Sequence, residues 1–223
     1  IDTSGKSGGV TLAEGDAHSF RVLGSSAISG GTFSAQLVPT VAALLEERKL
    51  TVHDVNGLCV ASGPGSFTGL RVGLSAVKGL AEVLHIPIAA VSLLAALASR
   101  SHAKGTVLAA LDAGRGEFFV GTYFKDADTN SQRCVDESLR TRAELLAQIQ
   151  ASPSPALITC DESVAQAASE TGISLETVSR PDSALIAQLG LERLLAGDTV
   201  AIEALDANYL RRSDAEIFFK GTR

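Results

Sequence analysis

The stretch "GPGSFTGLRVG", residues 63–73, decides how this sequence is interpreted. An apolar segment, "VNGLCVAS" (55–62), precedes it and predicts a buried strand, and a helix is expected to follow as far as Leu84. A glycine-rich loop between a strand and a helix is the arrangement that cradles phosphates in nucleotide-binding folds. The first question is therefore whether this loop binds a phosphate.

Neither nucleotide-binding fingerprint fits the loop. In a dinucleotide-binding loop the third glycine would stand one position before Gly69, and an acidic residue would follow about 20 positions later. A Walker loop closes with Gly-Lys-Ser/Thr, and no lysine stands here. Two interpretations stay open. The loop is a structural turn whose helix is capped by Ser66 or Thr68, or the free N–H groups of the helix form an anion site.

The helix expected over 69–84 has only a narrow polar side. Its polar residues form one stripe at helical spacing: Arg71, Ser75, Lys78 and Glu82. Gly69, Gly73 and Ala76 share another side, where a second helix could approach closely. Because a glycine inside a helix costs about 1 kcal/mol relative to alanine, close packing is expected to compensate. The helix is either sandwiched between a sheet and a neighbouring helix or placed at a subunit interface.

The rest of the chain alternates strands and helices, which predicts an α/β architecture with mixed sheets. Residues 1–25 have the pattern of strands and turns, and residues 125–156 are polar and predict a surface connector with one helix at 141–150. The other expected elements are a helix near 34–49, strands at 86–92 and 156–160, and helices at 161–171 and from 183 to Gly197.

Two segments about half a chain apart share one layout. "IDTSGKSGGVTLA" begins with a strand end at Asp2 and a glycine-rich turn, and "VLAALDAGRGEFFVGTYF" (107–124) has the same order around Asp112. This strand–Asp–turn–strand repeat predicts two related lobes. We expect an N-terminal lobe over 1–100 and a C-terminal lobe over 101–205. A tail over 206–223 is expected to pack back on the chain.

The composition excludes several classes of protein. The net charge is −6 and the pI about 5.2, so the chain lacks the basic excess that normally drives nucleic-acid binding. Its three cysteines are widely spaced, which favours a reducing cytoplasm over a disulfide framework or a zinc site. No apolar run reaches the length of a membrane span. Since the sequence opens on "IDTSG" and contains no methionine, we expect residues of the first strand to precede Ile1.

Several segments together resemble the TsaB family, also called YeaZ. The glycine motif "GPGSFTGLRVG" resembles the signature of that family, and the other matches run almost from end to end. They are "IDTS", "QLVPTVAALL", "AAVSLLAALA", "ALDAGRGEFFVGTY" and "DANYLRR". Within the fourth of these segments the chain departs from the family pattern, because Gly114 stands where a basic residue is usual and Arg115 follows.

The resemblance implies a fold and a function. The fold would be that of the actin, Hsp70 and sugar-kinase superfamily, with two ribonuclease-H-like (actin-like ATPase) lobes. The protein would be a cytoplasmic, non-catalytic scaffold subunit that activates TsaD, the catalytic homologue. TsaD transfers threonylcarbamoyl to N6 of the adenosine next to the anticodon of tRNA. The expected partners are TsaD, the ATPase TsaE and, in isolation, a second copy, with tRNA bound only through the complex.

The resemblance also places the subunit interface on the first two helices of the N-terminal lobe. We expect Gly73→Arg to leave the fold largely intact and to abolish dimer formation. The motif loop consists of Gly63, Pro64, Gly65, Ser66, Phe67, Thr68, Gly69 and Arg71. The candidate interface residues are Leu37, Val41, Leu44, Gly69, Gly73, Ala76, Val77 and Leu80.

No catalytic or metal-binding residues are expected. The four histidines, at positions 18, 53, 85 and 102, do not occur in pairs with metal-ligand spacing, so a zinc peptidase has no ligands here. The alternative function is an ATPase or small-molecule kinase of the actin superfamily, with Asp2, Thr3 and Asp112 as weak candidates for nucleotide binding. No cofactor is expected. The basic residues of the tail are expected to be solvated: Arg211, Arg212, Lys220 and Arg223.

Overall fold

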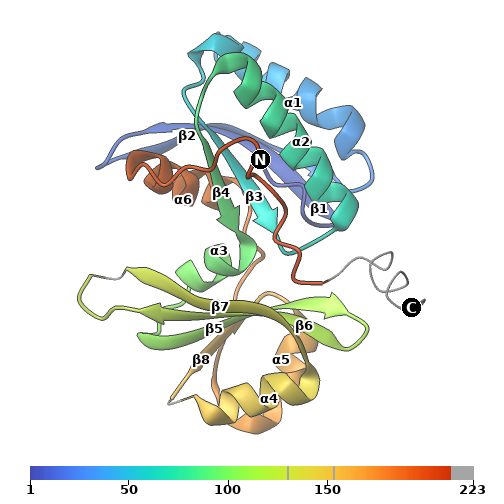
Figure 1. The fold of residues 1–223 in the computed structure, drawn as a ribbon, viewed down its shortest axis with the longest axis vertical. Helices are drawn as coiled ribbons and strands as arrows, with labels where there is room; N and C mark the ends of the chain where they lie inside the picture. The colour runs from blue at the N-terminus through green and yellow to red at the C-terminus, as the bar shows by residue number, and fades with distance from the viewer. Residues whose placement is uncertain (130, 153, 212–223) are drawn as a thin grey trace. The chain divides into compact units, whose positions relative to one another are not determined.

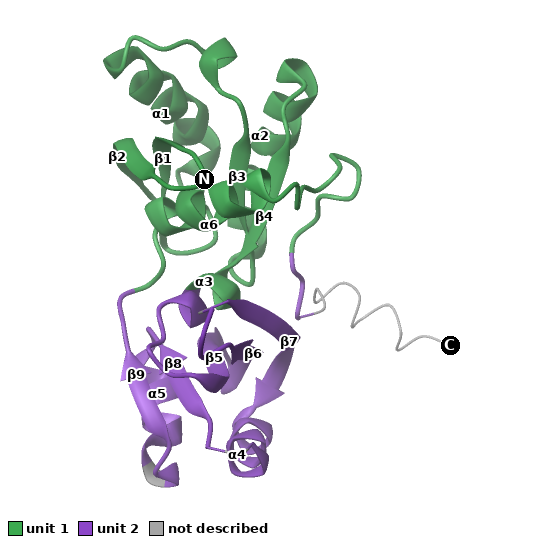
Figure 2. Cartoon of the chain, turned by 90° about the vertical axis from the view of Figure 1, so that its left-hand side faces the viewer, with its two compact units in different colours: residues 1–96, 180–207 green, residues 97–179, 208–223 purple. Residues whose placement is uncertain are grey.

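The structure is a computed structural model that describes residues 1–129, 131–152 and 154–211. It divides into two compact units, shown in Figure 2. Unit 1 contains residues 1–96 and 180–207, and unit 2 contains residues 97–179 and 208–211 of the described chain. The expected boundary near residue 100 lies close to the first crossing. The expected lobe over 101–205 differs from unit 2, because residues 180–207 return to unit 1.

The sheet of unit 1 is completed by the first residues of the chain. β1 (Ser7–Gly15) and β2 (Phe20–Ser29) form an antiparallel hairpin, and β3 (Leu58–Gly63) and β4 (Ile88–Ser92) are parallel. Asp2 pairs with Gly9 of β1 through two backbone hydrogen bonds of 2.9 and 2.8 Å. Ile1 pairs on its other side with β3, because its N–H donates to Cys59 O and its carbonyl accepts from Ala61 N. The spatial order is therefore β2, β1, residues 1–3, β3, β4.

Helices cover both faces of this sheet. Successive residues of a strand face opposite sides, and a Cβ at Gly8 would lie 3.0 Å from Phe33, whereas one at Gly9 would lie 3.1 Å from Ser183. α1 (Phe33–Glu47), which contains Phe33, and α6 (Ser183–Leu195), which begins with Ser183, therefore lie on opposite faces. α2 (Phe67–Leu84) packs beside α1, as Figure 1 shows, and contacts β3. A short 3₁₀ helix, η1 (Val52–Asp54), precedes β3.

α6 explains why unit 1 is discontinuous in sequence. The helix contacts β1, β3 and β4, and its Gly190 lies directly on Cys59 of β3. A Cβ at position 190 would lie 2.3 Å from the Cys59 sulfur, so only glycine permits this packing distance. The face of the unit 1 sheet opposite α1 is thus covered by a helix that follows unit 2 in the sequence.

Unit 2 repeats the strand order of unit 1. Its sheet has the order β7-β6-β5-β8-β9, with β5 parallel to β8 and antiparallel to β6. β5 takes the place that residues 1–3 take in unit 1, so the predicted repeat is confirmed in the topology, as is the mixed α/β fold. The strands are β5 (Gly105–Gly114), β6 (Glu117–Lys125), β7 (Gln132–Thr141), β8 (Ala156–Thr159) and β9 (Ser174–Thr177).

The helices of unit 2 are short, and two of them pack on its sheet. α3 (Leu93–Ser99) begins in unit 1 and ends in unit 2. α4 (Arg142–Ala151) starts with a capping box between Thr141 and Glu144. α5 (Glu162–Ala168) continues into the 3₁₀ helix η2 (Ser169–Thr171). Leu145 of α4 and Val164 of α5 are fully buried against Leu108 and Leu157 of the sheet.

The helix predicted at 141–150 within the connector over 125–156 is confirmed as α4, but the connector prediction missed β7 in the same segment. The strand pairs along its whole length with β6 and has no strand on its other side within the described residues. An edge strand buries little of its surface, and most β7 side chains are exposed or half-buried. The polar sequence therefore lacked the apolar alternation that identifies a strand.

The segment 99–103 of unit 2 is held by two charged side chains. Lys125 is buried, and its ammonium donates to the carbonyls of Ser99 and Ser101. Glu176 accepts from Ser101 Oγ at 2.5 Å and from His102 N at 2.9 Å. Partial burial alone would raise the pKa of Glu176, but the hydrogen bonds from residues 101–103 outweigh it and hold the pKa below its ordinary value of 4.5.

This pKa shift predicts an acid-sensitive contribution to stability. Because the folded-state pKa of Glu176 is depressed, its contribution is fully present above the ordinary value and is lost as the pH falls through the folded-state pKa. Glu176→Gln should therefore be less stable near neutral pH and should lose less stability on acidification, measured by urea unfolding at stepped pH values. Glu82→Gln, an exposed control in α2, should keep the parent's stability near neutral pH. An unchanged pH dependence in Glu176→Gln would contradict this assignment.

Candidate interaction site

The motif loop is shaped to fit residues 3 and 4, which precede β1. Ser66 N donates to Ser4 O at 2.7 Å, and a Cβ at Gly65 would lie 2.3 Å from the same oxygen. Of the two expected caps, Ser66 is the one observed, because its Oγ accepts from Gly69 N at 3.3 Å. The glycine-rich loop therefore packs on the chain's own backbone, which supports the structural interpretation.

α2 lies unusually close to Thr3. A Cβ at Gly69 would lie 2.0 Å from Thr3 O, and one at Gly73 would lie 2.3 Å from Thr3 Oγ1. The buried Thr3 hydroxyl donates to Gly69 O at 2.8 Å, which joins strand and helix directly. The two glycines thus permit close approach by this chain's first strand. The expectation that Gly73→Arg leaves the fold largely intact conflicts with this packing, because even a Cβ at position 73 would clash with Thr3 Oγ1.

Five of the eight candidate interface residues lie in the core of unit 1. A buried residue is not available to a partner in this conformation. These five residues therefore pack in the core and do not form the contact surface. Val41 and Ala76 are half-buried and pack against the same core, and Leu80 is half-buried. The buried five are Leu37, Leu44, Gly69, Gly73 and Val77.

Two valines that sequence reasoning missed lie on the outer surface of these helices. Val38 of α1 is 61% exposed and Val83 of α2 is 75% exposed. Small residues flank them at helical spacing, with Ala35 and Ala42 on α1 and Gly79 on α2, all exposed. The signal in the sequence was the apolar residue left over once the core-facing positions of each helix were assigned. The outer sides of α1 and α2, which we call the small-residue surface, therefore each carry one exposed valine beside small residues.

The motif residues at the start of α2 are also exposed. The Arg71 guanidinium lies 3.8 Å from the centre of the Phe67 ring, within cation–π distance. Gly63 and Pro64 are buried, whereas Gly65 to Thr68 are exposed. The charged stripe of the helix begins with this Arg–Phe pair and ends with Glu82, so it borders the small-residue surface.

The two hairpin aspartates have one local geometry in both units. Asp2 Oδ1 accepts from Ser4 N at 2.9 Å, and Asp112 Oδ1 accepts from Gly114 N at 2.6 Å. Each is an aspartate turn of two residues, the role that aspartate commonly takes at a strand end. Asp2 is only 2% exposed and also accepts from Ser4 Oγ. Asp112 is exposed, and its second oxygen accepts from Ser163 Oγ. Both carboxylates thus hold the turn that follows their strand.

The remaining candidate residues do not gather into a site. In the part of the chain that the structure describes, no three His, Cys, Asp or Glu side chains lie close enough to hold a metal ion. Arg211 pairs with Glu117 and donates to Gly114 O at 3.2 Å, and Asn208 donates to Glu137, so residues 208–211 pack on unit 2. Arg115 has a positive φ of 61° in the turn before β6. The tail residues Arg212, Lys220 and Arg223 lie outside the described residues.

Comparison with curated proteins finds several relatives named TsaB. The chain is 41% identical over 91 residues to the tRNA threonylcarbamoyladenosine biosynthesis protein TsaB of Bacillus subtilis (strain 168), covering 40% of each chain. It is 36% identical over 94 residues to the Escherichia coli (strain K12) protein of the same name, covering 41% of each. The match thus spans about two fifths of the length of these relatives.

Comparison with protein families covers more of the chain. The family model of TsaD, tRNA N6-adenosine threonylcarbamoyltransferase, matches residues 28–191, which is more than half of the sequence. The chain belongs to this family, in its TsaB/YeaZ branch. None of the described helices is long and apolar enough to span a membrane.

Solved structures of the TsaB/YeaZ branch have the same fold. A Pseudomonas aeruginosa protein described as similar to peptidase YeaZ has a TM-score of 0.75 at 27% identity, covering 94% of this chain and 97% of its own. YeaZ from Pseudomonas aeruginosa has a TM-score of 0.71 at 24% identity, covering 92% and 97%. The predicted actin-like α/β fold is therefore confirmed.

Three glycines of α2 should respond differently to alanine. Gly73→Ala should lower the free energy of unfolding by about 1–3 kcal/mol through overpacking against Thr3. Gly69→Ala should cost at least as much, since the added atom meets the Thr3 backbone oxygen. Gly79→Ala, where no atom of the described residues beyond its own turn of helix lies within 4 Å of the added Cβ, should instead stabilise the helix by about 0.5–1 kcal/mol. Urea unfolding followed by circular dichroism measures all three.

A second substitution separates the two contacts. Thr3→Ala removes the hydroxyl that opposes Gly73 but leaves the backbone oxygen that opposes Gly69. It should therefore offset part of the cost of Gly73→Ala and none of the cost of Gly69→Ala. Parent-like stability of Gly69→Ala and Gly73→Ala would show that α2 does not approach Thr3 as closely as described.

Proposed function

We propose that this chain is a non-catalytic scaffold subunit in the synthesis of threonylcarbamoyladenosine in tRNA. The observation that carries the proposal is the 41% identity to a protein named for that biosynthesis, over 91 residues. The match to the TsaD family model supports a catalytic partner that is homologous to this chain. In the proposed complex the TsaD-like homologue transfers the threonylcarbamoyl group, and a TsaE-like ATPase joins the pair.

The outer side of α1 and α2 is the proposed contact with the TsaD-like homologue. Its small residues let a partner helix approach closely, and Val38 and Val83 supply apolar area to bury. Arg71 and Glu82 at the border are placed to form a polar rim. The homologue is expected to present equivalent helices, so that four helices pack together. In isolation a second copy of the chain would cover the same surface.

Activation of the partner would work through its conformation. A subunit that binds one conformation of the catalytic homologue more tightly shifts the population toward that conformation. The scaffold needs no residue in the active site for this effect. Since the net charge of the chain is −6, we assign the tRNA contacts to the complex. We therefore expect the subunit to act in the cytoplasm, where tRNA is modified.

Charge placed on the helix surface should separate the subunits. Val38→Asp and Val83→Asp each put a carboxylate into an apolar contact, so each should weaken binding to the TsaD-like homologue at least about tenfold. Calorimetric titration of the two purified proteins measures the effect. Val135→Asp on β7, at a valine that is 56% exposed, is the matched control and should bind as the parent does. Unfolding curves check that all three variants remain folded.

The same variants connect binding with function. In a tRNA modification assay with the TsaD-like homologue, the parent chain should stimulate transfer, and Val38→Asp and Val83→Asp should lose that stimulation in proportion to their loss of binding. Stimulation that survives in variants unable to bind would contradict the scaffold mechanism. Transfer by the chain alone would contradict its non-catalytic role.

The alternative function is an actin-superfamily ATPase or kinase using Asp2 and Asp112. The repeated aspartate turn in both hairpins is the observation that favours it. Against it, the Asp2 carboxylate is buried and accepts two hydrogen bonds from Ser4. We expect calorimetry with Mg-ATP on the isolated chain to detect neither tight binding nor turnover. Turnover that is lost in Asp112→Asn would favour the kinase instead.

A further inference from the structure

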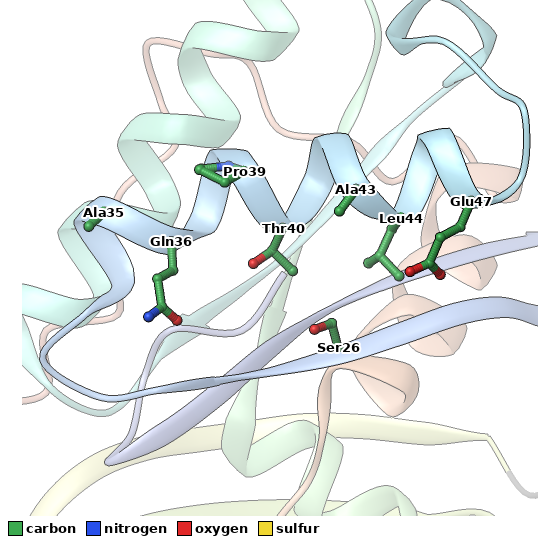
Figure 3. A pocket seen from close by; sticks show the side chains of 8 residues that line it. All are labelled: Ser26, Ala35, Gln36, Pro39, Thr40, Ala43, Leu44 and Glu47. Atoms are coloured by element: carbon green, nitrogen blue, oxygen red, sulfur yellow. The ribbon is translucent and has the colours of Figure 1, made fainter.

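A groove lies between the edge strand β2 and helix α1. It has a volume of about 290 Å³ and is open to solvent along its length. Figure 3 shows Gln36, Thr40, Ala43 and Glu47 pointing from α1 toward β2, where Ser26 forms the floor. These four positions follow the spacing i, i+4, i+7, i+11 and so form one stripe of the helix. The stripe differs from the outer side of α1 that carries Val38, and Ala35 lies at the border of the two.

β2, which contributes Ser26 to the groove, is an edge strand of its sheet. β2 pairs with β1 alone within the described residues, so its other backbone edge has no strand beside it. Ser26 of β2 lines the groove, whereas Leu44 and Arg48 of α1 cover the neighbouring Gly24. An exposed strand edge is a template for a further strand, because its N–H and C=O groups can pair with another chain.

The length of the groove matches an extended peptide. From Gln36 to Glu47 the helix rises about 16 Å at about 1.5 Å per residue. A strand covers the same distance with about five residues at about 3.3 Å each. Ser26, Gln36 and Thr40 are half-buried or exposed, and their side chains form no hydrogen bond among the described residues. They are therefore available to polar groups of an occupant.

The charge at one end of the groove specifies the occupant further. Glu47 is the last residue of α1, where the helix dipole places partial negative charge, and it forms no ion pair within the described chain. The neighbouring Arg48 extends over Gly24 instead, with Nε 3.8 Å from where a Cβ would stand. A cationic side chain beside Glu47 would complement both the carboxylate and the dipole.

We infer that this groove binds an extended peptide segment of another protein, which adds a strand to β2 and places a Lys or Arg beside Glu47. A second copy of β2 fits less well, because its one basic residue, Arg21, already pairs with Glu14 of the same hairpin. The inference concerns a different surface from the proposed contact with the TsaD-like homologue. Backbone pairing supplies the affinity, and Glu47 supplies the preference for a basic peptide.

The test uses a defined set of peptides of about seven residues that alternate Val and Thr. In each peptide one position carries Lys, and a matching set carries Glu at the same position. Fluorescence anisotropy with the full chain should find a Lys position that binds at least about tenfold more tightly than its Glu counterpart. Methylating alternate backbone nitrogens of that peptide should abolish binding. Amide shifts in NMR spectra of the chain should be confined to β2 and α1.

A charge reversal makes the inference falsifiable. Glu47→Lys should invert the preference from the Lys peptide to the Glu peptide, whereas Glu82→Lys, an exposed control outside the groove, should leave it unchanged. The inference is overturned if no peptide of the set binds at millimolar concentration, or if Glu47→Lys binds both sets as the parent does. It is also overturned if sedimentation shows a dimer of the chain that the peptides displace, because the occupant would then be a second copy.

Discussion

The contact between Thr3 and α2 is the constraint on which unit 1 depends. The Thr3 hydroxyl donates to Gly69 O, and the Thr3 backbone oxygen fills the space where a Gly69 side chain would be. Because residues 1–3 also join β1 to β3, this one contact fixes the helix against the centre of the sheet. The glycines of the motif therefore allow close packing. Because the side of α2 that carries them must face Thr3, the opposite side of the helix is exposed.

Much of the fold follows from the sequence, because the apolar segments and glycine turns recur in the same order in both halves. The repeat around Asp2 and Asp112 predicts the shared strand order, and the chain confirms it. β7 could not be recognised, since an edge strand buries too little to need an apolar pattern. The place of α6 could not be recognised either, because its partners on β1 and β3 are more than a hundred positions away in the sequence.

The candidate interface shows a different limit of sequence reasoning. Helices 34–49 and 69–84 were predicted close to their observed positions, yet the residues selected on them were mostly those that face the core. Periodicity identifies an apolar side but does not tell whether the sheet or a partner covers it. The exposed valines at positions 38 and 83 mark a side of each helix that the sheet does not cover. Each is a single apolar residue among small or polar neighbours. Once the core is assigned, α1 presents two separate surfaces: the small-residue side and the polar stripe above β2.

The return of α6 to unit 1 has a consequence for synthesis of the chain. Cys59 and its neighbours on β3 are covered by Gly190, so this face of the sheet stays uncovered until more than a hundred further residues have left the ribosome. Unit 2 is nearly continuous in sequence and can form its sheet in the meantime. A nascent chain halted between the two units would expose the apolar face of β3 and β4, which is a surface that chaperones bind. Because unit 1 is discontinuous in sequence, this face of its sheet is covered only when α6 packs on it.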